Sequence, residues 1–338
     1  MLITGAVLMA AAGLAFASTS NLVFLIVAGT VGVISPSGNE VGPFLSIEQA
    51  ALSQIVPNHF RTAVFAWYTL AGSFATAAGS LCGGVLSQVL QRTAMTPVES
   101  YRLVVVLYAA LGVLLAVCFT RVSPGVEVSE PEAGSTAVLK TSWGIGRSGD
   151  VVLKLSGLFA LDSFAGGFVM QSFAAYWFYL RFGVNPGTLG AIFFGANLLA
   201  GVSALLASRL ATRFGLVRTM VFTHLPSNIL LILVPLMPNL PLAILVLFAR
   251  FSISQMDVPT RQSYIMAVVR PEERSAAAGI TGVARTTGAA IAPIFAGWMF
   301  ARPALLSLPF FIAGTLKVIY DLLLYHGFEA VHPPEEGT

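Results

Sequence analysis

Charged residues are scarce in this chain, and their scarcity limits the class of protein. Only 10% of the 338 residues are Asp, Glu, Lys or Arg, whereas 56% are hydrophobic and the mean hydropathy is +0.83. Soluble domains carry about 25% charged residues, so a water-soluble globule of this length is excluded. The net charge of +3 is too small to indicate a nucleic-acid partner. The composition predicts a polytopic protein in a lipid bilayer.

Sequence signatures of catalysis and of metal binding are missing as well. The two cysteines, Cys82 and Cys118, lie in apolar runs and match no metal or redox spacing. The chain has no HExxH or GxSxG pattern and no cluster of histidines, so we expect no enzyme, no metal and no other cofactor. It also has no P-loop, which leaves ATP-driven transport by this chain unsupported.

Long apolar segments recur along the chain. A bilayer core of ~30 Å needs ~20 apolar residues in a helix, and the sequence predicts about ten such spans. Their approximate bounds are 1–18, 21–55, 63–90, 103–122, 154–180, 188–208, 219–237, 241–268, 276–300 and 306–326. The second span is too long for one straight helix, and the Pro and Gly residues of "SPSGNEVGP" should bend it. The predicted fold class is an all-α membrane helix bundle.

A polar stretch at 123–150, rich in Pro, Gly and Ser, predicts a linker between two membrane halves. We expect an N-terminal half of about four spans at 1–122, a six-helix half at 151–328 and a tail at 329–338. Lys and Arg number eleven on the linker side of the membrane and four on the other. This bias predicts that the linker and the C-terminus are cytoplasmic.

The two halves resemble each other weakly at a constant offset of 213 positions. The matched pairs are Gln49 with Gln262, Arg61 with Arg274, Ala63 with Ala276 and Gly84 with Gly297. Parallel repeats are a transporter architecture. The repeated loop follows the fourth span of the second half but only the second span of the first half. We therefore expect the chain to lack an N-terminal pair of helices, either as a truncated form or as a true ten-span variant.

The segment "SRLATRFGLVRTM", Ser208–Met220, resembles the loop motif G-x-L-a-D-R-x-G-r-k of the major facilitator superfamily of secondary transporters. The matching residues are Leu210, Ala211, Arg213, Phe214, Gly215 and Arg218. Thr212 replaces the Asp of the motif and Ser208 its first Gly, which puts the gate contact of that Asp in doubt. The resemblance covers nearly the whole chain, as family helices three to twelve. The loop "VRPEERSAAAG" is typical of efflux-like members.

The resemblance implies two pseudo-symmetric halves that rock around a central site and move a small molecule by alternating access. It further implies an integral protein of the plasma (inner) membrane, a monomer, and protons as the candidate coupling ion for efflux or antiport. The alternative is a non-transporting or partner-dependent truncated remnant of such a transporter. The substrate class stays open, because central arginines suit an anion whereas the efflux-like loop suits amphipathic drugs or metabolites.

Four charged residues within the spans are candidates for the substrate path or for proton coupling. At 1.5 Å per residue, Arg250 and Arg285 lie ~13 and ~15 Å into their helices, and Asp162 lies ~12 Å into its own. A charge at the bilayer centre costs ~2.5–3.5 kcal/mol, so we expect these groups to face a cavity or a paired acid. Asp162 is the predicted acidic partner or proton carrier, and Glu40 is the corresponding acid of the first half. A buried network that only holds helices together is the alternative.

A second set of residues is predicted to form the cytoplasmic gate. Its members are Asp257, Arg261, Glu48, Arg213, Gly215 and Arg218. Arg261, at ~30 Å along its span, is expected at the membrane edge, where it can snorkel. Asp257 is expected to pair with it across a bend at Pro259. Lys317 and Asp321, also four apart, are predicted to form another local pair.

Four polar residues within spans are weaker candidates for lining the path. They are Gln171, Asn197, Asn228 and Gln255. Such side chains can contact a substrate or form hydrogen bonds from helix to helix. His224 also lies within a span and can titrate near neutral pH, although an isolated histidine indicates little by itself.

Overall fold

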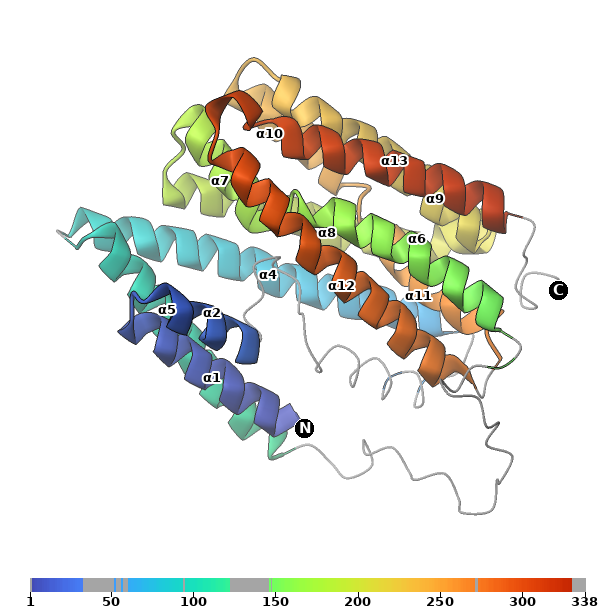
Figure 1. Ribbon diagram of the computed structural model, residues 1–338, viewed down its shortest axis with the longest axis horizontal. Coiled ribbons are helices and arrows are strands. Elements are labelled where there is room, and N and C mark those ends of the chain that lie inside the picture. The colour runs from blue at the N-terminus through green and yellow to red at the C-terminus, as the bar shows by residue number, and fades with distance from the viewer. Residues whose placement is uncertain are drawn as a thin grey trace.

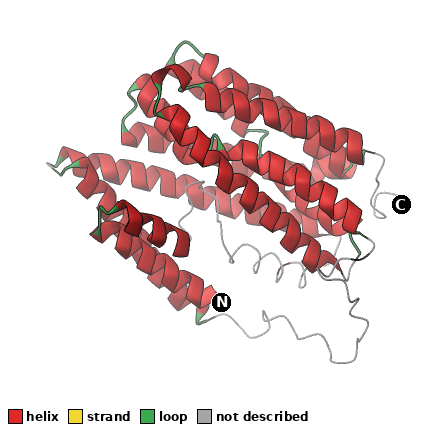
Figure 2. Cartoon of the chain, in the orientation of Figure 1, coloured by secondary structure: helices red, strands yellow, loops and turns green. Residues whose placement is uncertain are grey.

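The computed structural model describes residues 2–32, 60–93, 95–121, 148–270 and 273–329, together with Leu52, Val56 and Gly146. The described residues form helices joined by short loops and contain no strand (Figure 2). Glu40 and Glu48, most of the second predicted span and nearly all of the linker lie outside these residues.

The described helices follow the predicted spans closely. The helices before the linker are α1 (Leu2–Ser18), α2 (Leu22–Val31), α4 (Arg61–Arg92) and α5 (Pro97–Phe119). Those after it are α6 (Gly149–Gly167), α7 (Gln171–Phe182), α8 (Pro186–Phe214), α9 (Leu216–Leu233), α10 (Leu240–Phe251), α11 (Asp257–Val268), α12 (Arg274–Phe300) and α13 (Leu308–Phe328), with short 3-10 turns at Val234–Leu236 and Pro303–Leu305.

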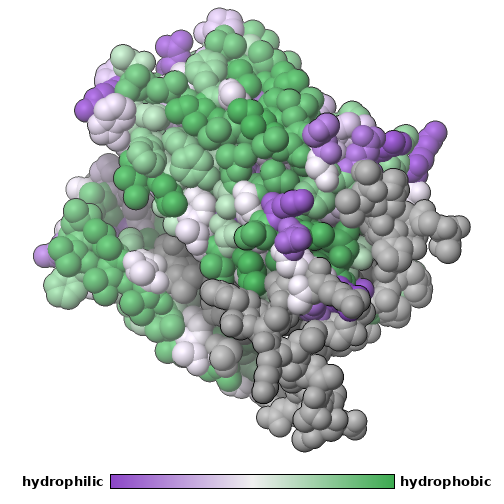
Figure 3. All heavy atoms as spheres, turned by 45° about the vertical axis from the view of Figure 1, so that its right-hand side comes forward, coloured by the Kyte–Doolittle hydropathy of each residue, from purple (hydrophilic) through white to green (hydrophobic). Residues whose placement is uncertain are grey.

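Six stretches of the described residues are helical, long and apolar enough to cross a membrane. They are Ala63–Arg92, Pro97–Phe119, Gly149–Phe182, Pro186–Phe214, Leu216–Leu236 and Pro303–Phe328, and α1, α2 and α10 are shorter apolar helices. On the face shown in Figure 3, hydrophobic side chains cover most of the described surface, and hydrophilic ones form separate small patches. Such a surface suits contact with lipid.

The helices after the linker form one bundle, and α4 lies along it (Figure 1). The main packed pairs are α4 with α8, α6 with α12, α9 with α13, and α1 with α5. Helix pairs in lipid are held by van der Waals packing, which small residues favour because they let backbones approach closely. At the crossing of α4 and α8, a Cβ atom on Gly84 would lie 2.6 Å from the Pro186 carbonyl oxygen.

The predicted span 154–180 corresponds to the candidate span Gly149–Phe182, but its helix is interrupted between Gly167 and Gln171. Two glycines end α6, and glycine is the poorest helix former after proline. Gly167 also packs closely against α12, because a Cβ atom on Gly167 would lie 2.8 Å from the Ala289 carbonyl oxygen. The chain turns at Met170 in an extended conformation before α7 begins.

The predicted span 241–268 is broken too, but not where the sequence indicates. Helix α10 ends at Phe251 and α11 begins at Asp257, so the break precedes the Asp257–Pro259 bend that the sequence predicts. Pro259 lies in the first turn of α11, where its missing N–H group needs no partner within the helix. The bend at Pro259 is therefore a wrong prediction.

The internal repeat has a counterpart among the helix starts. Helix α4 begins at Arg61 and α12 at Arg274, the same offset of 213 positions that relates the two sequence segments. These two long helices thus begin at matching positions of the repeat.

Candidate functional site

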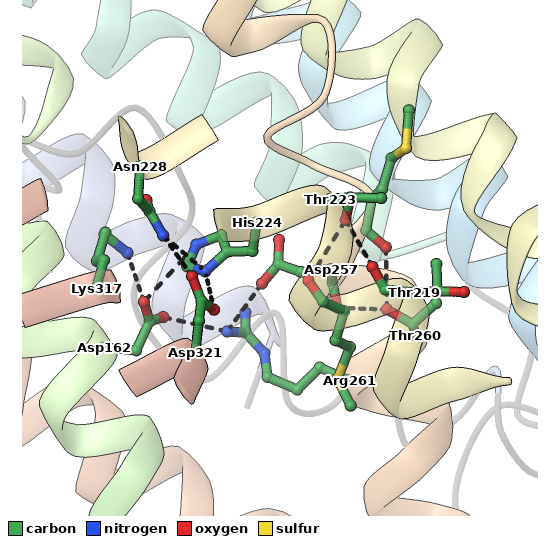
Figure 4. Close-up of polar contacts among 12 residues, drawn as sticks. Asp162, Thr219, Thr223, His224, Asn228, Asp257, Thr260, Arg261, Lys317 and Asp321 are labelled. Carbon is green, nitrogen blue, oxygen red and sulfur yellow. Dashed lines mark hydrogen bonds and ion pairs between the residues drawn. The ribbon is translucent and has the colours of Figure 1, made fainter. Parts of the chain in front are cut away.

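A cluster of charged and polar side chains lies buried among the helices after the linker (Figure 4). Its members are Asp162 of α6, His224 and Asn228 of α9, Asp257 and Arg261 of α11, and Lys317 and Asp321 of α13. None of these seven residues is more than 8% exposed. Buried charges are tolerated only when they are paired and hydrogen-bonded, so the pairing within the cluster determines what it can do.

Asp162 is the centre of one group of contacts. Its Oδ1 atom lies 2.5 Å from Lys317 Nζ, and its Oδ2 atom lies 3.3 Å from Arg261 Nη1. Arg261 Nη1 also lies 3.3 Å from Asp257 Oδ2, one turn earlier on the same helix. The predicted pairing of Asp257 with Arg261 is therefore present. The prediction that Asp162 partners Arg250 or Arg285 is wrong as a direct ion pair, because Lys317 and Arg261 occupy its oxygens.

His224 and Asp321 are the centre of the second group. His224 Nδ1 lies 2.8 Å from Asp321 Oδ1, and Asn228 Nδ2 donates to Asp321 Oδ2 at 2.8 Å. The other ring nitrogen, His224 Nε2, lies 3.9 Å from Asp162 Oδ1. His224 thus stands between the two aspartates, with Tyr320 edge-on to its ring.

The local pair predicted between Lys317 and Asp321 is wrong. Among the described residues, Lys317 forms its ion pair with Asp162 of α6, and Asp321 forms its contacts with α9. Both side chains do project from α13 at i,i+4 spacing. The spacing therefore indicates a common face of the helix, but the partners that meet this face come from two other helices.

Arg261 was expected to snorkel into water at the membrane edge, but the structure buries its side chain. The side chain is 4% exposed and lies inside the cluster, with its guanidinium 5.6 Å from the centre of the Phe159 ring. Its charge is therefore compensated by neighbouring carboxylates and not by water.

Arg250 and Arg285 lie beside the cluster without joining its ion pairs. Arg250 is in the last turn of α10, with its guanidinium 5.1 Å from the centre of the Phe251 ring, and Arg285 is near the middle of α12. The Nε atom of each is buried without a hydrogen-bond partner, and no ion pair to either appears within the described part of the chain. Both interact electrostatically with Asp162 and Asp257. Thr286 and Thr287 are exposed on α12 directly after Arg285.

The motif residues between α8 and α9 lie at the end of the bundle. Gly215 joins the two helices with a φ angle of +86°, which favours glycine. Arg213 is exposed beside the Phe214 ring, and Arg218 lies 3.1 Å from Glu329 Oε1, which also accepts a hydrogen bond from the Tyr325 hydroxyl. An exposed ion pair of this kind contributes about 0–1 kcal/mol.

The weaker candidates divide between two places. Gln171 donates to Ser80 Oγ of α4 at 3.0 Å and accepts from Asn197 at 3.0 Å, so these two join α7, α8 and α4. Asn228 belongs to the charge cluster, and Gln255 lies in the break between α10 and α11.

Sequence reasoning missed the roles of Lys317, His224 and Glu273. The first two share a usable signal, a second polar residue four positions away on an apolar helix. Glu273 is 2% exposed and accepts from the backbone N–H groups of Gly146 and Ser148, at 2.7 and 3.2 Å, just before α6. It thereby ties the start of α6 to the start of α12, and its charge suits a helix N-terminus.

These features define an integral membrane protein whose apolar helices enclose ionisable groups. The profile of the Major Facilitator Superfamily matches residues 155–338, more than half of the chain. The chain therefore belongs to the major facilitator superfamily, whose architecture the sequence motifs predict.

Known proteins agree with this assignment. The uncharacterized membrane protein YJR124C of Saccharomyces cerevisiae is 30% identical over 357 residues, covering 96% of this chain and 78% of the yeast protein. The human organic anion transporter MFSD10 (TETRAN) is similar in structure, with a TM-score of 0.62 and 16% identity over 96% of this chain and 76% of that one. A bacterial homologue of the iron transporter ferroportin, in an outward-facing state, has a TM-score of 0.59 and 14% identity over 96% and 82% of the two chains.

Proposed function

We propose that this protein is a secondary transporter that moves a small anionic solute by alternating access, with Arg250 and Arg285 binding the anion. The observation that carries the proposal is that these two guanidinium groups project from helices α10 and α12 of the bundle, each with a buried Nε atom that makes no hydrogen bond within the described residues. The family and the fold neighbours support the transporter class.

The energetics favour an anion at this place. A charged side chain at the bilayer centre costs about 2.5–3.5 kcal/mol unless it is compensated. Each described carboxylate of the cluster already lies within contact distance of Lys317, Arg261 or His224. The guanidinium group has a planar fork of donors that fits a carboxylate, sulfonate or phosphate. A bound anion would supply the partner that Arg250 and Arg285 lack within the described residues.

The surroundings of Arg250 also suit a binding site. Transporters of this kind bind substrate and ions at discontinuous helices near the membrane midplane, and Arg250 immediately precedes the break between α10 and α11. Thr286 and Thr287, which follow Arg285 on α12, are exposed. One fold neighbour is named as an organic anion transporter, which agrees with this substrate class, although 16% identity establishes likeness of fold alone.

The remaining features of the transporter are proposed on the sequence. We place the linker and the C-terminus in the cytoplasm, divide the chain into halves at 1–122 and 151–328, and expect a monomer in the plasma membrane. Asp257 and Arg261 are proposed to act at the inner gate with Arg213, Gly215 and Arg218. The efflux-like loop favours export in exchange for protons. An inward proton gradient drives the anion outward if protons and anion are exchanged, and inward if they move together. The direction of anion movement therefore distinguishes the two modes.

Uptake into proteoliposomes tests the proposal. We expect the full chain to transport aromatic sulfonates or carboxylates and not the cation tetraethylammonium. Arg250→Gln and Arg285→Gln should each lower anion uptake at least about tenfold, because one lost charge-assisted contact is worth about 1.5–3 kcal/mol. Arg302→Gln, which changes an exposed arginine next to Trp298, serves as the control. Unchanged uptake in both variants contradicts the proposal, and no uptake of any solute by the parent protein favours the non-transporting alternative.

A further inference from the structure

The contacts of His224 favour one position for the proton of its neutral ring. His224 Nδ1 lies 2.8 Å from Asp321 Oδ1 and 3.1 Å from Asn228 Nδ2, and because an ionised carboxylate only accepts, we assign the proton to Nδ1. The second oxygen of Asp321 accepts from Asn228. In the neutral ring, Nε2 therefore presents its lone pair, and it presents it to Asp162 Oδ1 at 3.9 Å. A proton on Nε2 would turn this repulsive contact into an attractive one.

Within the ion-pair network of His224, the carboxylates outnumber the cations by one while the ring is neutral. The ionisable groups of the surrounding helices are Asp162 of α6, Arg250 of α10, Asp257 and Arg261 of α11, Arg285 of α12, and Lys317, Tyr320 and Asp321 of α13; Arg250 and Arg285 lie outside the ion-pair network. Within the ion-pair network, three carboxylates face the two fixed cations Arg261 and Lys317. One proton on His224 balances the network.

We propose that His224, held by Asp321 and Asn228, is the coupling-proton site of this transporter, and that Asp162 links it to the anion site at Arg250 and Arg285. The proposal rests on the proposed function for its anion site. The proton enters from water, binds at Nε2 and forms an imidazolium that bridges Asp321 and Asp162. No covalent step is involved.

Protonation of His224 affects anion binding because the same carboxylates interact with the His224 network and with the two arginines. Asp162 and Asp257 interact electrostatically with both Arg250 and Arg285. While His224 is neutral, the excess negative charge of the network partly compensates these two arginines. Once His224 is protonated, the network is balanced, and the arginines need a charge from outside. Proton and anion thus strengthen each other's binding, and this reciprocity favours their moving together over exchange.

Asp162 is less suited to carry the proton itself. A proton on its carboxylate would leave Lys317, at 2.5 Å, and Arg261, at 3.3 Å, facing a neutral group. Asp321 has no Lys or Arg partner among the described residues, and its contacts are with His224 and Asn228. In this scheme Asp162 is a positioning residue, which replaces the proton-carrier role that its depth in the sequence suggests.

The first experiment observes the proton on His224 in an intact cluster. The chain has four histidines, and the variant with His59, His326 and His332 changed to Gln retains the imidazole of His224 alone. We expect the ¹⁵N chemical shifts of this ring, in the full chain in lipid nanodiscs, to change from the neutral to the imidazolium pattern between pH 8 and pH 5. Shifts that stay constant across this range overturn the proposal.

The second experiment measures the link to the anion with p-toluenesulfonate, which stays ionised throughout this range. We expect the dissociation constant of the parent protein to be on the order of tenfold lower at pH 5.5 than at pH 8. His224→Gln should remove this pH dependence, while the control His326→Gln, at an exposed residue of α13, should keep it. Equal pH dependence in His224→Gln overturns the link. Failure of every variant to bind the sulfonate contradicts the anion site, and the ¹⁵N titration still decides the proton site.

Discussion

At the residue scale, partners from distant helices determine what each buried charge does. The position of Asp162 within its span marks it as a residue that needs compensation, and the structure buries it against two cations. The position does not reveal that Asp162 pairs with Lys317, 155 positions away, because such a contact depends on how α6 and α13 pack. Local i,i+4 spacing finds the pairing of Asp257 with Arg261 but misassigns Lys317 and Asp321. Periodicity places side chains on a face, and only tertiary packing selects their partners.

The Lys317–Asp162 ion pair gives a prediction at this scale. Lys317→Met leaves the Asp162 carboxylate short of one cation in a buried place, so we expect a loss of about 3–5 kcal/mol in the free energy of unfolding. The double variant Lys317→Met, Asp162→Leu should recover most of this loss, because it removes both charges. Chemical unfolding in detergent measures both values, with the exposed Lys154→Met as the control. Additive losses in the double variant would contradict a coupled pair.

At the scale of the elements, the sequence locates helices better than it locates their breaks. Apolar runs with polar ends place α4, α9, α12 and α13 within a few residues, because lipid requires each backbone group to be bonded within its own helix. The breaks at 168–170 and 252–256 carry weaker signals. The first follows a Gly pair, but the second, Ser252–Met256, contains neither glycine nor proline. Packing of the neighbouring helices sets such positions.

The contact of Glu273 with the start of α6 gives a prediction for an element. Glu273→Ala removes a carboxylate that accepts two backbone N–H groups at the start of this helix. Loss of a helix cap costs about 0.5–2 kcal/mol, so the first turn of α6 should open more often. Hydrogen exchange at residues 149–153 should accelerate, while exchange in α8 stays constant. Glu329→Ala, which removes an exposed pair with Arg218, is the control. Unchanged exchange in α6 would refute the capping role.

At the scale of the whole molecule, the repeat, the linker and the loop motif together predict the family. The offset of 213 positions also relates the starts of α4 and α12, so the repeat extends to the placement of helices. The contacts between α4 and α8 could not be predicted from the sequence. Small residues allow two helices to approach closely, but they do not determine which helix is the partner. The charge cluster was predictable in part, since its acids and Arg261 were singled out but their joint arrangement was not.

In the transport cycle inferred above, a proton on His224 and an anion on Arg250 and Arg285 cross the membrane together. The most direct measurement follows both fluxes in the same proteoliposomes, with a pH dye inside and labelled p-toluenesulfonate outside. An inward proton gradient should drive sulfonate accumulation in the parent protein, accompanied by acidification of the interior. His224→Gln should lose the accumulation, and Arg250→Gln should lose both fluxes. Sulfonate movement that is independent of the proton gradient, or that an inward gradient drives outward, would contradict joint transport of proton and anion.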